Sequence, residues 1–190
     1  MVCIWKTGVF WLTWIPAFAR MTLRGATILP LPTGAGSRMK EPLPDLRDPT
    51  LPEAAVRAAL DLMPHPEGGH YRELWRDSPE AGGRGAASAI LFLLAASERS
   101  HWHRVDASEI WIWQAGAPLA LGLCYPGGER RTIKLGPNIG NSEVFQGVVP
   151  PHVWQEAAST GAWSRLSCIV APAFQFEGCE LAPPGWAPAA

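Results

Sequence analysis

The amino-acid sequence predicts an all-β protein, a sandwich or barrel, with one short helix before the first strand. Short apolar runs follow one another from residue 64 onward, and they have the two-residue alternation of strands. Turns rich in proline or glycine separate these runs. One earlier segment, residues 50–62, has helical spacing, but no helices alternate with the strands as a parallel sheet would require.

Composition sets limits on size and partners. The chain has 190 residues, of which 47% are hydrophobic and 17% are charged, and this is enough for one domain with a sizeable core. The formal net charge is −1 and the sequence contains no basic stripe, so we expect no nucleic-acid partner. The four cysteines form no C-x-x-C pair, which favours reduced thiols in a cytoplasmic protein.

Residues 1–40 are interpreted as a disordered or spurious extension. Their apolar run, residues 9–18, is too short to span a bilayer, so we expect no membrane anchor. The stretch formed by residues 14–22 resembles the translated product of repeats found between bacterial genes, in which case translation begins at Met21 or Met39. The alternative is a secreted protein whose signal peptide ends near Ala19.

The helix is predicted from a capping signal. Thr50 and Glu53 have the spacing of a capping box, in which the Thr50 hydroxyl accepts from the Glu53 amide and Glu53 reaches back. Pro52 in the first turn sacrifices no helical hydrogen bond. We expect the helix to continue to about Leu62 and to bury one apolar stripe against the main body. That stripe consists of Val56, Ala59, Leu60 and Met63.

Ten strands are predicted within one domain that spans residues 41–182. Each is bounded by turn residues, because proline fixes φ and glycine permits unusual values. The tail, residues 183–190, is expected to be loose. The predicted strands are residues 70–76, 88–95, 101–105, 109–114, 119–125, 130–135, 143–149, 153–158, 163–171 and 175–181.

Residues 101–113 are the most informative segment, because they have the pattern of a tight hairpin with a three-residue turn. Strand alternation places one set of residues from each arm on a common face. An imidazole, a carboxylate and large aromatic rings would then converge inside one cavity. The residues concerned are His101, His103 and Val105 on the first arm and Glu109, Trp111 and Trp113 on the second.

This segment resembles the first motif of the cupin superfamily. His103, Glu109 and Gly116 have the spacing of that motif, and Val105 stands where the family has a second histidine. A register that pairs His101 with His103 leaves five residues before Glu109, which is longer than the motif permits. The first register is therefore preferred.

A second stretch resembles the other cupin motif, with His152 at its glycine position and Gln155 at its metal-binding histidine. Further likenesses narrow the resemblance to the cupin-five group, a domain of unknown function, over roughly residues 53–182. The resemblance implies a double-stranded β-helix, the cupin jelly-roll barrel. Such proteins are commonly homodimers, and the group is similar in shape to nucleotide-sugar epimerases that work without metal. The further likenesses lie at residues 62–73, 89–94 and 170–177.

The motif positions also bear on the cofactor. A metal ion in this barrel would bind His103, Glu109 and Gln155, because Val105 supplies no ligand. His101 would join them only if the strand bulged to turn it inward. A neutral amide is a poor substitute for imidazole on a soft transition metal. We therefore expect no metal cofactor, with iron or manganese as the alternative.

Without metal, His103 is the residue whose ordinary pKa suits proton transfer near neutrality, and Glu109 would orient its ring. The opposing acid is expected to be Tyr71 or Glu73. Both alternate with Arg72 and are expected to face inward. The alternative is a structural role in which His103 and Glu109 merely satisfy each other.

Ligand binding is assigned to a further set of polar and aromatic residues, since large rings stack against sugar faces. We expect a small polar, sugar-like molecule in the barrel and an isomerase or epimerase with His103 as general base. The other hypotheses are a non-catalytic small-ligand-binding cupin and a metal-dependent oxygenase-type cupin. The ligand-binding set is Ser100, Trp111, Trp113 and Gln155.

The loop formed by residues 65–69 has two interpretations. In the first, it lays Glu67 or His65 over the mouth of a cavity. In the second, it connects helix and strand, and its glycines permit unusual backbone angles. The second is preferred for Gly68 and Gly69.

Overall fold

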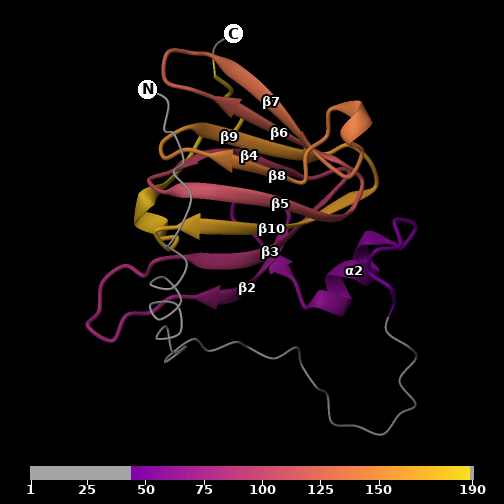
Figure 1. Ribbon diagram of the computed structural model, residues 1–190, viewed down its shortest axis with the longest axis horizontal. Helices are drawn as coiled ribbons and strands as arrows, with labels where there is room; N and C mark the ends of the chain where they lie inside the picture. Colours follow the sequence, from indigo (N-terminus) through magenta and orange to yellow (C-terminus); the bar gives the residue numbers. More distant parts are fainter. Residues whose placement is uncertain (1–43, 189–190) are drawn as a thin grey trace, which may run out of the picture.

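The computed structural model describes residues 44–188, so the predictions made for residues 1–40 lie outside the described residues. Within residues 44–188, two antiparallel β-sheets face each other (Figure 1). This part of the chain also has one α-helix, α2 (Glu53–Leu60), and two 3₁₀ helices, η1 (Ile139–Asn141) and η2 (Phe176–Gly178). The predicted fold, an all-β jelly roll with one short N-terminal helix, is confirmed.

Both sheets contain strands that are distant in the sequence. The six-stranded sheet has the spatial order β1 (Met63–Pro64), β2 (His70–Arg76), β3 (Ser88–Ala95), β10 (Trp163–Ala171), β5 (Ser108–Gly116) and β8 (Gln146–Val149). The five-stranded sheet has the order β11 (Cys179–Leu181), β4 (Arg99–Val105), β9 (Trp154–Ser159), β6 (Leu119–Cys124) and β7 (Arg130–Leu135). β2, β3, β7 and β10 have the bounds that the sequence predicts.

The hydrophobic core fills the space between the sheets. In β3, Phe92 and Leu94 face this interior, whereas Leu91 and Leu93 face outward and are covered by helix α2. The three leucines of β6 also contribute to the interior cluster. Strand alternation therefore gives β3 two apolar faces, one for each neighbouring layer.

Helix α2 packs on the outer face of the six-stranded sheet, where Val56 and Leu60 are buried (Figure 1). The predicted capping box is wrong, because Pro52 is the N-cap residue and no side chain caps this helix. The Thr50 hydroxyl donates instead to Asp48 Oδ1 at 2.7 Å. The helix is held by its buried face rather than by a cap.

The predicted hairpin at residues 101–113 is wrong. Its two arms belong to different sheets, since β4 pairs with β9 and β11 whereas β5 pairs with β10 and β8. Asp106 and Ala107 carry the chain across, and Arg84 donates two hydrogen bonds of 2.8 Å to the Asp106 carboxylate. His103 and Glu109 are therefore buried on opposite sheets.

β4 contains a bulge between Ser100 and His103. Both of these residues are buried, whereas His101 between them is exposed. An extra residue in a strand shifts the alternation beyond it. The predicted common face of His101, His103 and Val105 is therefore not formed.

The C-terminal part differs from the prediction at its last strand. The last predicted strand begins later, at Cys179, because residues 176–178 form η2. The described part of the tail places the Trp186 ring 4.6 Å from the Trp154 ring and 6.4 Å from the Trp102 ring, centroid to centroid. Helices in the described part of the chain are too short or too polar to cross a membrane.

Candidate functional site

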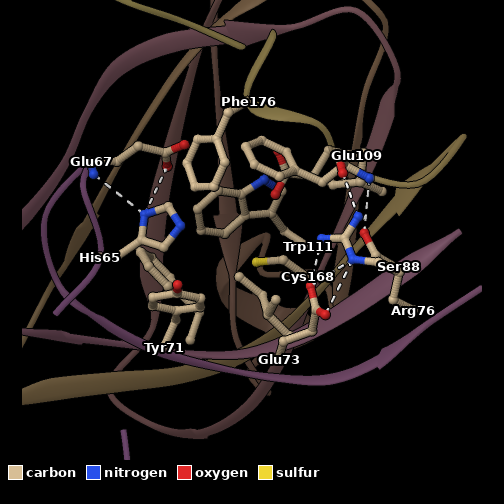
Figure 2. Close-up of a pocket in the computed structure, with 14 residues that line it drawn as sticks. His65, Glu67, Tyr71, Glu73, Arg76, Ser88, Glu109, Trp111, Cys168 and Phe176 are labelled. Atoms are coloured by element: carbon tan, nitrogen blue, oxygen red, sulfur yellow. Dashed lines mark hydrogen bonds and ion pairs between the residues drawn. The ribbon is translucent and has the colours of Figure 1, made fainter. Parts of the chain in front are cut away.

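A cavity of about 80 Å³ lies along the inner face of the six-stranded sheet (Figure 2). One water needs about 10–15 Å³ of such space, so the cavity accommodates several waters or a small molecule. Glu73, Arg76 and Phe176 are partly exposed and mark its open end. The other polar lining residues are His65, Glu67, Tyr71, Ser88 and Glu109.

Glu67 lies on the loop between β1 and β2 and joins this loop to β4. Its neighbour Gly68 has a φ of +104°, and a Cβ there would clash with the Arg99 carbonyl oxygen. The Glu67 carbonyl accepts from the His101 N–H at 2.8 Å, and the Ser100 hydroxyl donates to Glu67 Oε2 at 3.3 Å. A close approach that only glycine permits thus turns the Glu67 carboxyl into the interior.

The His103 ring is completely buried between its own backbone and Glu67. Nδ1 lies 2.7 Å from the His101 carbonyl oxygen, which can only accept, so Nδ1 carries a proton. Nε2 lies 3.4 Å from Glu67 Oε2. Attraction between these two atoms needs one proton, held by either the ring or the carboxyl. The contact between His103 and Glu67 therefore requires a proton on one of the two groups.

Gln155 fixes the orientation of the Glu109 carboxyl. Trp111 Nε1 can only donate, and it donates to Gln155 Oε1 at 2.9 Å. The amide NH₂ of Gln155 must then be the group that donates to Glu109 Oε2, at 2.6 Å. The Cys168 thiol also donates to the Glu109 carboxyl. These four side chains are buried, so the carboxyl is held in one position on the cavity wall.

Burial changes the proton affinity of the inner groups. Removal from water raises the pKa of Glu109 to about 7, against the lowering effects of His103 and of the hydrogen bond from Gln155. The nearby Glu67 raises it further. Burial also raises the pKa of Glu67 and lowers the pKa of both His103 and His65. Glu109 is thus poised to give or take a proton near neutral pH.

An ion pair lies at the open end. Arg76 donates to the Glu73 carboxylate through Nε and Nη2, the latter at 2.6 Å, and to the Phe174 carbonyl oxygen through Nη1. A register shift between Glu73 and Trp75 puts Arg76 on the cavity side of β2 together with Glu73. These contacts use three of the five guanidinium N–H groups. Two donors remain for a ligand.

Four of the predicted site residues line the cavity. Tyr71 and Glu73 face it from β2, as alternation predicts, and Glu109 and Trp111 face it from β5. Figure 2 shows all four around one space. Their chemical roles stay predictions.

The remaining predicted site residues do not line this cavity. His103 was expected to face a ligand, but Glu67 lies between its Nε2 and the cavity wall. Trp113 packs in the core, and its Nε1 donates to the Ala117 carbonyl oxygen at 3.0 Å. His101 is exposed outside the barrel, which removes it from the candidate ligand set. Three further predicted site residues are buried behind the side chains that line the cavity, namely Ser100, His103 and Gln155.

Arg76 and Ser88 line the cavity but were not predicted to do so. Plain alternation from Tyr71 puts Arg76 on the outer face, and the register shift that reverses it leaves no mark in the sequence. One interpretation of the loop at residues 65–69 places His65 or Glu67 at the cavity, and both residues line the cavity. The signal for them was the pair of glycines that follows, which lets the loop approach β4.

One protein-family model matches most of the described chain. Residues 54–182 match the family model described as Cupin_5, cupin superfamily (DUF985). The chain belongs to the Cupin_5 family. The resemblance predicted from the sequence is confirmed. None of the curated proteins compared matches this Cupin_5 chain.

Two solved structures are similar to this Cupin_5 protein. A protein from Shewanella oneidensis is 35% identical with a TM-score of 0.64, over 66% of this chain and 81% of that chain. A hypothetical protein from Leishmania major is 29% identical with a TM-score of 0.61, over 66% of this chain and 84% of that chain. Neither description states an activity.

The motif positions of this Cupin_5 chain do not fit a metal ion. Val105 packs in an apolar cluster and has no donor atom. Both ends of the Gln155 amide are engaged, its oxygen by Trp111 and its nitrogen by Glu109. His103 has its Nδ1 on a backbone carbonyl. No group of three or more His, Cys, Asp or Glu residues within residues 44–188 could hold a metal ion.

Proposed function

We propose that this protein is a metal-independent isomerase or epimerase that moves a proton at the carbon next to the carbonyl of a small, sugar-like substrate. The observation that carries the proposal is Glu109. This carboxyl lines the cavity, is fixed by Gln155 and has its pKa raised to about 7 by burial. A positioned base with such a pKa is what proton transfer near neutral pH requires.

In the proposed reaction, ionised Glu109 removes the proton from the substrate carbon. The C–H electron pair moves into the adjacent C–C bond, and the carbonyl π pair moves onto oxygen to give an enediolate. Glu109 is then neutral. In an isomerisation, the hydroxyl proton passes between the two oxygens of the enediolate, and Glu109 returns its proton to the neighbouring carbon. In an epimerisation, the proton is returned to the other face of the same carbon by another cavity group, for which Tyr71 is the candidate.

His103 has a different role in this proposal from the one expected from the sequence. It cannot reach a substrate past Glu67, but the Glu67–His103 pair lies beside Glu109 and its charge state affects the Glu109 pKa. His103 is therefore a positioning residue. The three residues of the five-stranded sheet that stand behind the wall, Ser100, His103 and Gln155, hold Glu67 and Glu109 in place.

The composition of the wall supports a sugar-like ligand. Apolar side chains, among them Ile90, Phe92 and Trp111, offer a surface for the C–H groups of a sugar, while carboxyl, hydroxyl and imidazole groups offer partners for its hydroxyls. The two remaining N–H donors of Arg76 at the open end would suit an anionic substituent.

The proposal is tested by proton exchange. Dihydroxyacetone phosphate, fructose 6-phosphate, ribose 5-phosphate and a nucleotide-4-ketosugar are incubated with the protein in deuterated water. We expect deuterium at the carbon next to the carbonyl of at least one of them, unchanged exchange after treatment with EDTA, and loss of exchange in Glu109→Gln. Binding of these compounds without any exchange would instead support the non-catalytic binding module.

A further inference from the structure

The cavity holds a second group with defined chemistry, the imidazole of His65. Its Nδ1 accepts a hydrogen bond of 3.3 Å from the Glu67 backbone N–H. A backbone amide can only donate, so Nδ1 is unprotonated and the proton of the neutral ring is on Nε2. The local backbone thus selects one of the two tautomers.

The protonated nitrogen faces the cavity. In Figure 2, the ring nitrogen of His65 that is not bonded to Glu67 points into the space in front of Trp111. No residue within 44–188 is hydrogen-bonded to His65 Nε2. Two edge-on rings fix the imidazole, Tyr71 at 4.5 Å and Phe92 at 5.5 Å between centroids. A rigid N–H donor is therefore directed at whatever occupies the cavity.

The surroundings of His65 favour the uncharged ring. Burial lowers its pKa, and the positive form of nearby His103 would lower it further. The opposing influence is Glu67, whose Oε2 lies 3.7 Å from His65 Nδ1. Burial also raises the pKa of Glu67, which acts against its ionised form.

We propose that His65 is a second catalytic residue, whose Nε2–H donates to the carbonyl oxygen of the substrate while Glu109 removes the proton from the adjacent carbon. This inference rests on the proposed function and deepens it. The proton moves from carbon to Glu109, and the electron pair ends on the oxygen that His65 holds. His65 keeps its own proton, and its hydrogen bond strengthens as the oxygen becomes negative.

The proposal narrows the substrate class. One oxygen must reach His65 Nε2 while the neighbouring C–H reaches Glu109, and a second oxygen must be present to make an enediolate. These conditions describe an α-hydroxy aldehyde or ketone. A neutral imidazole suits this chemistry, since its own N–H acidity is close to that of an enediol and a cation is not needed.

Two variants separate donation from packing. His65→Gln places an amide NH₂ near the position of Nε2, and His65→Phe keeps a ring against Tyr71 and Phe92 but has no donor. We expect His65→Phe to exchange deuterium roughly 100- to 1,000-fold more slowly than the wild type, as loss of one oxyanion donor does elsewhere, and His65→Gln to recover part of the rate. Exchange at the wild-type rate in His65→Phe would overturn the proposal.

A second measurement does not depend on turnover. The ¹⁵N spectrum of the histidine side chains in the wild type distinguishes the two neutral tautomers and the cation, and His65→Gln assigns the His65 signals. We expect the Nε2–H form near neutral pH and a downfield shift of its proton on addition of glycolohydroxamate, a mimic of an enediolate. The Nδ1–H form, the cation or an unmoved signal would overturn the role of His65.

The two proposals fail in different ways. If the wild type exchanges and Glu109→Gln does not, but His65→Phe exchanges normally, the proposed function stands and the role of His65 is refuted. If the wild type exchanges with none of the four compounds, the proposed function fails. A shifted His65 proton with glycolohydroxamate would then show donation to a bound ligand without catalysis, and the catalytic role of His65 would be refuted as well.

Discussion

The cavity has carboxyl groups near a basic side chain at two depths, and the two depths differ in their exposure to solvent. At the inner wall, Glu67 and Glu109 are buried near His103, and burial raises the pKa of both carboxyls. At the open end, Glu73 lies beside Arg76 with side chains that are 40% and 34% exposed. Solvent screens the outer pair. Depth thus makes the inner groups suitable for proton transfer and the outer groups suitable for binding.

The largest expected difference is in proton exchange. Glu109→Gln should slow deuterium exchange by about 10²–10⁴-fold, because it removes the base. Glu73→Gln, the matched change at the open end, should leave most of the rate. In the wild type, the rate should rise with pH through about 7 as Glu109 ionises beside His103, Glu67 and Cys168. Equal losses in the two variants would remove the distinction between the depths.

The next largest effect is expected in the pH dependence of the free energy of unfolding. The pKa of Glu109 is about 7 in the folded protein and ordinarily 4.5, so the folded state binds this proton more tightly. Stability contributed by that proton is present below 4.5 and is lost as the pH rises to about 7. The difference corresponds to about 3 kcal/mol.

Denaturant unfolding of the wild type and of Glu109→Gln measures this effect. The variant has no carboxyl to ionise, so it should gain about 3 kcal/mol relative to the wild type between about pH 4.5 and about pH 7.5. A constant difference between Glu109→Gln and wild type at all pH values would contradict the raised pKa.

Gln155→Leu tests the link between the two sheets. It leaves the Trp111 N–H and the Glu109 carboxyl without the amide that joins them, and each orphaned buried group costs about 1–3 kcal/mol. Since the amide lowers the pKa of Glu109, its loss should also move the acid limb of the exchange profile to higher pH. A stable variant with an unmoved profile would show that the hydrogen bond has no influence.

The smallest effect is expected at the open end. Arg76→Gln breaks a partly exposed ion pair, which should change the free energy of unfolding by less than about 1 kcal/mol. If Arg76 binds an anionic substituent, KM for a phosphorylated substrate should rise while KM for its unphosphorylated analogue stays constant. A large loss of stability would show that this pair supports the fold.

The sequence predicts the bounds of strands well where turn residues end an apolar run. β2, β3, β7 and β10 agree in both bounds. It does not predict pairing, because hydrogen bonds between strands join residues that are distant in the chain. The supposed hairpin is the example, since His103 pairs with Gln155 rather than with a residue near Glu109.

The candidate site was predictable only in part, for physical reasons. Tyr71 and Glu109 were placed on the correct face because they lie on regular strand segments. Arg76 was not, because a single-residue bulge shifts the alternation before it. His103 does face inward, but Glu67 from a loop distant in the sequence lies between it and the cavity. Thr50 was misread as a cap because its hydroxyl had a closer partner in Asp48.

The two-residue crossing from β4 to β5 constrains how this chain can change in length. Asp106 is held by Arg84, and it lies so close to Gly178 that a side chain there would clash. An insertion at the crossing would therefore break these contacts and move Glu109 relative to the Glu67–His103 pair. Gly127 and Gly128, at the tip of the β6–β7 hairpin, have no neighbours within 4 Å of a Cβ position. A peptide tag inserted at that tip should leave the positions of the cavity residues unchanged.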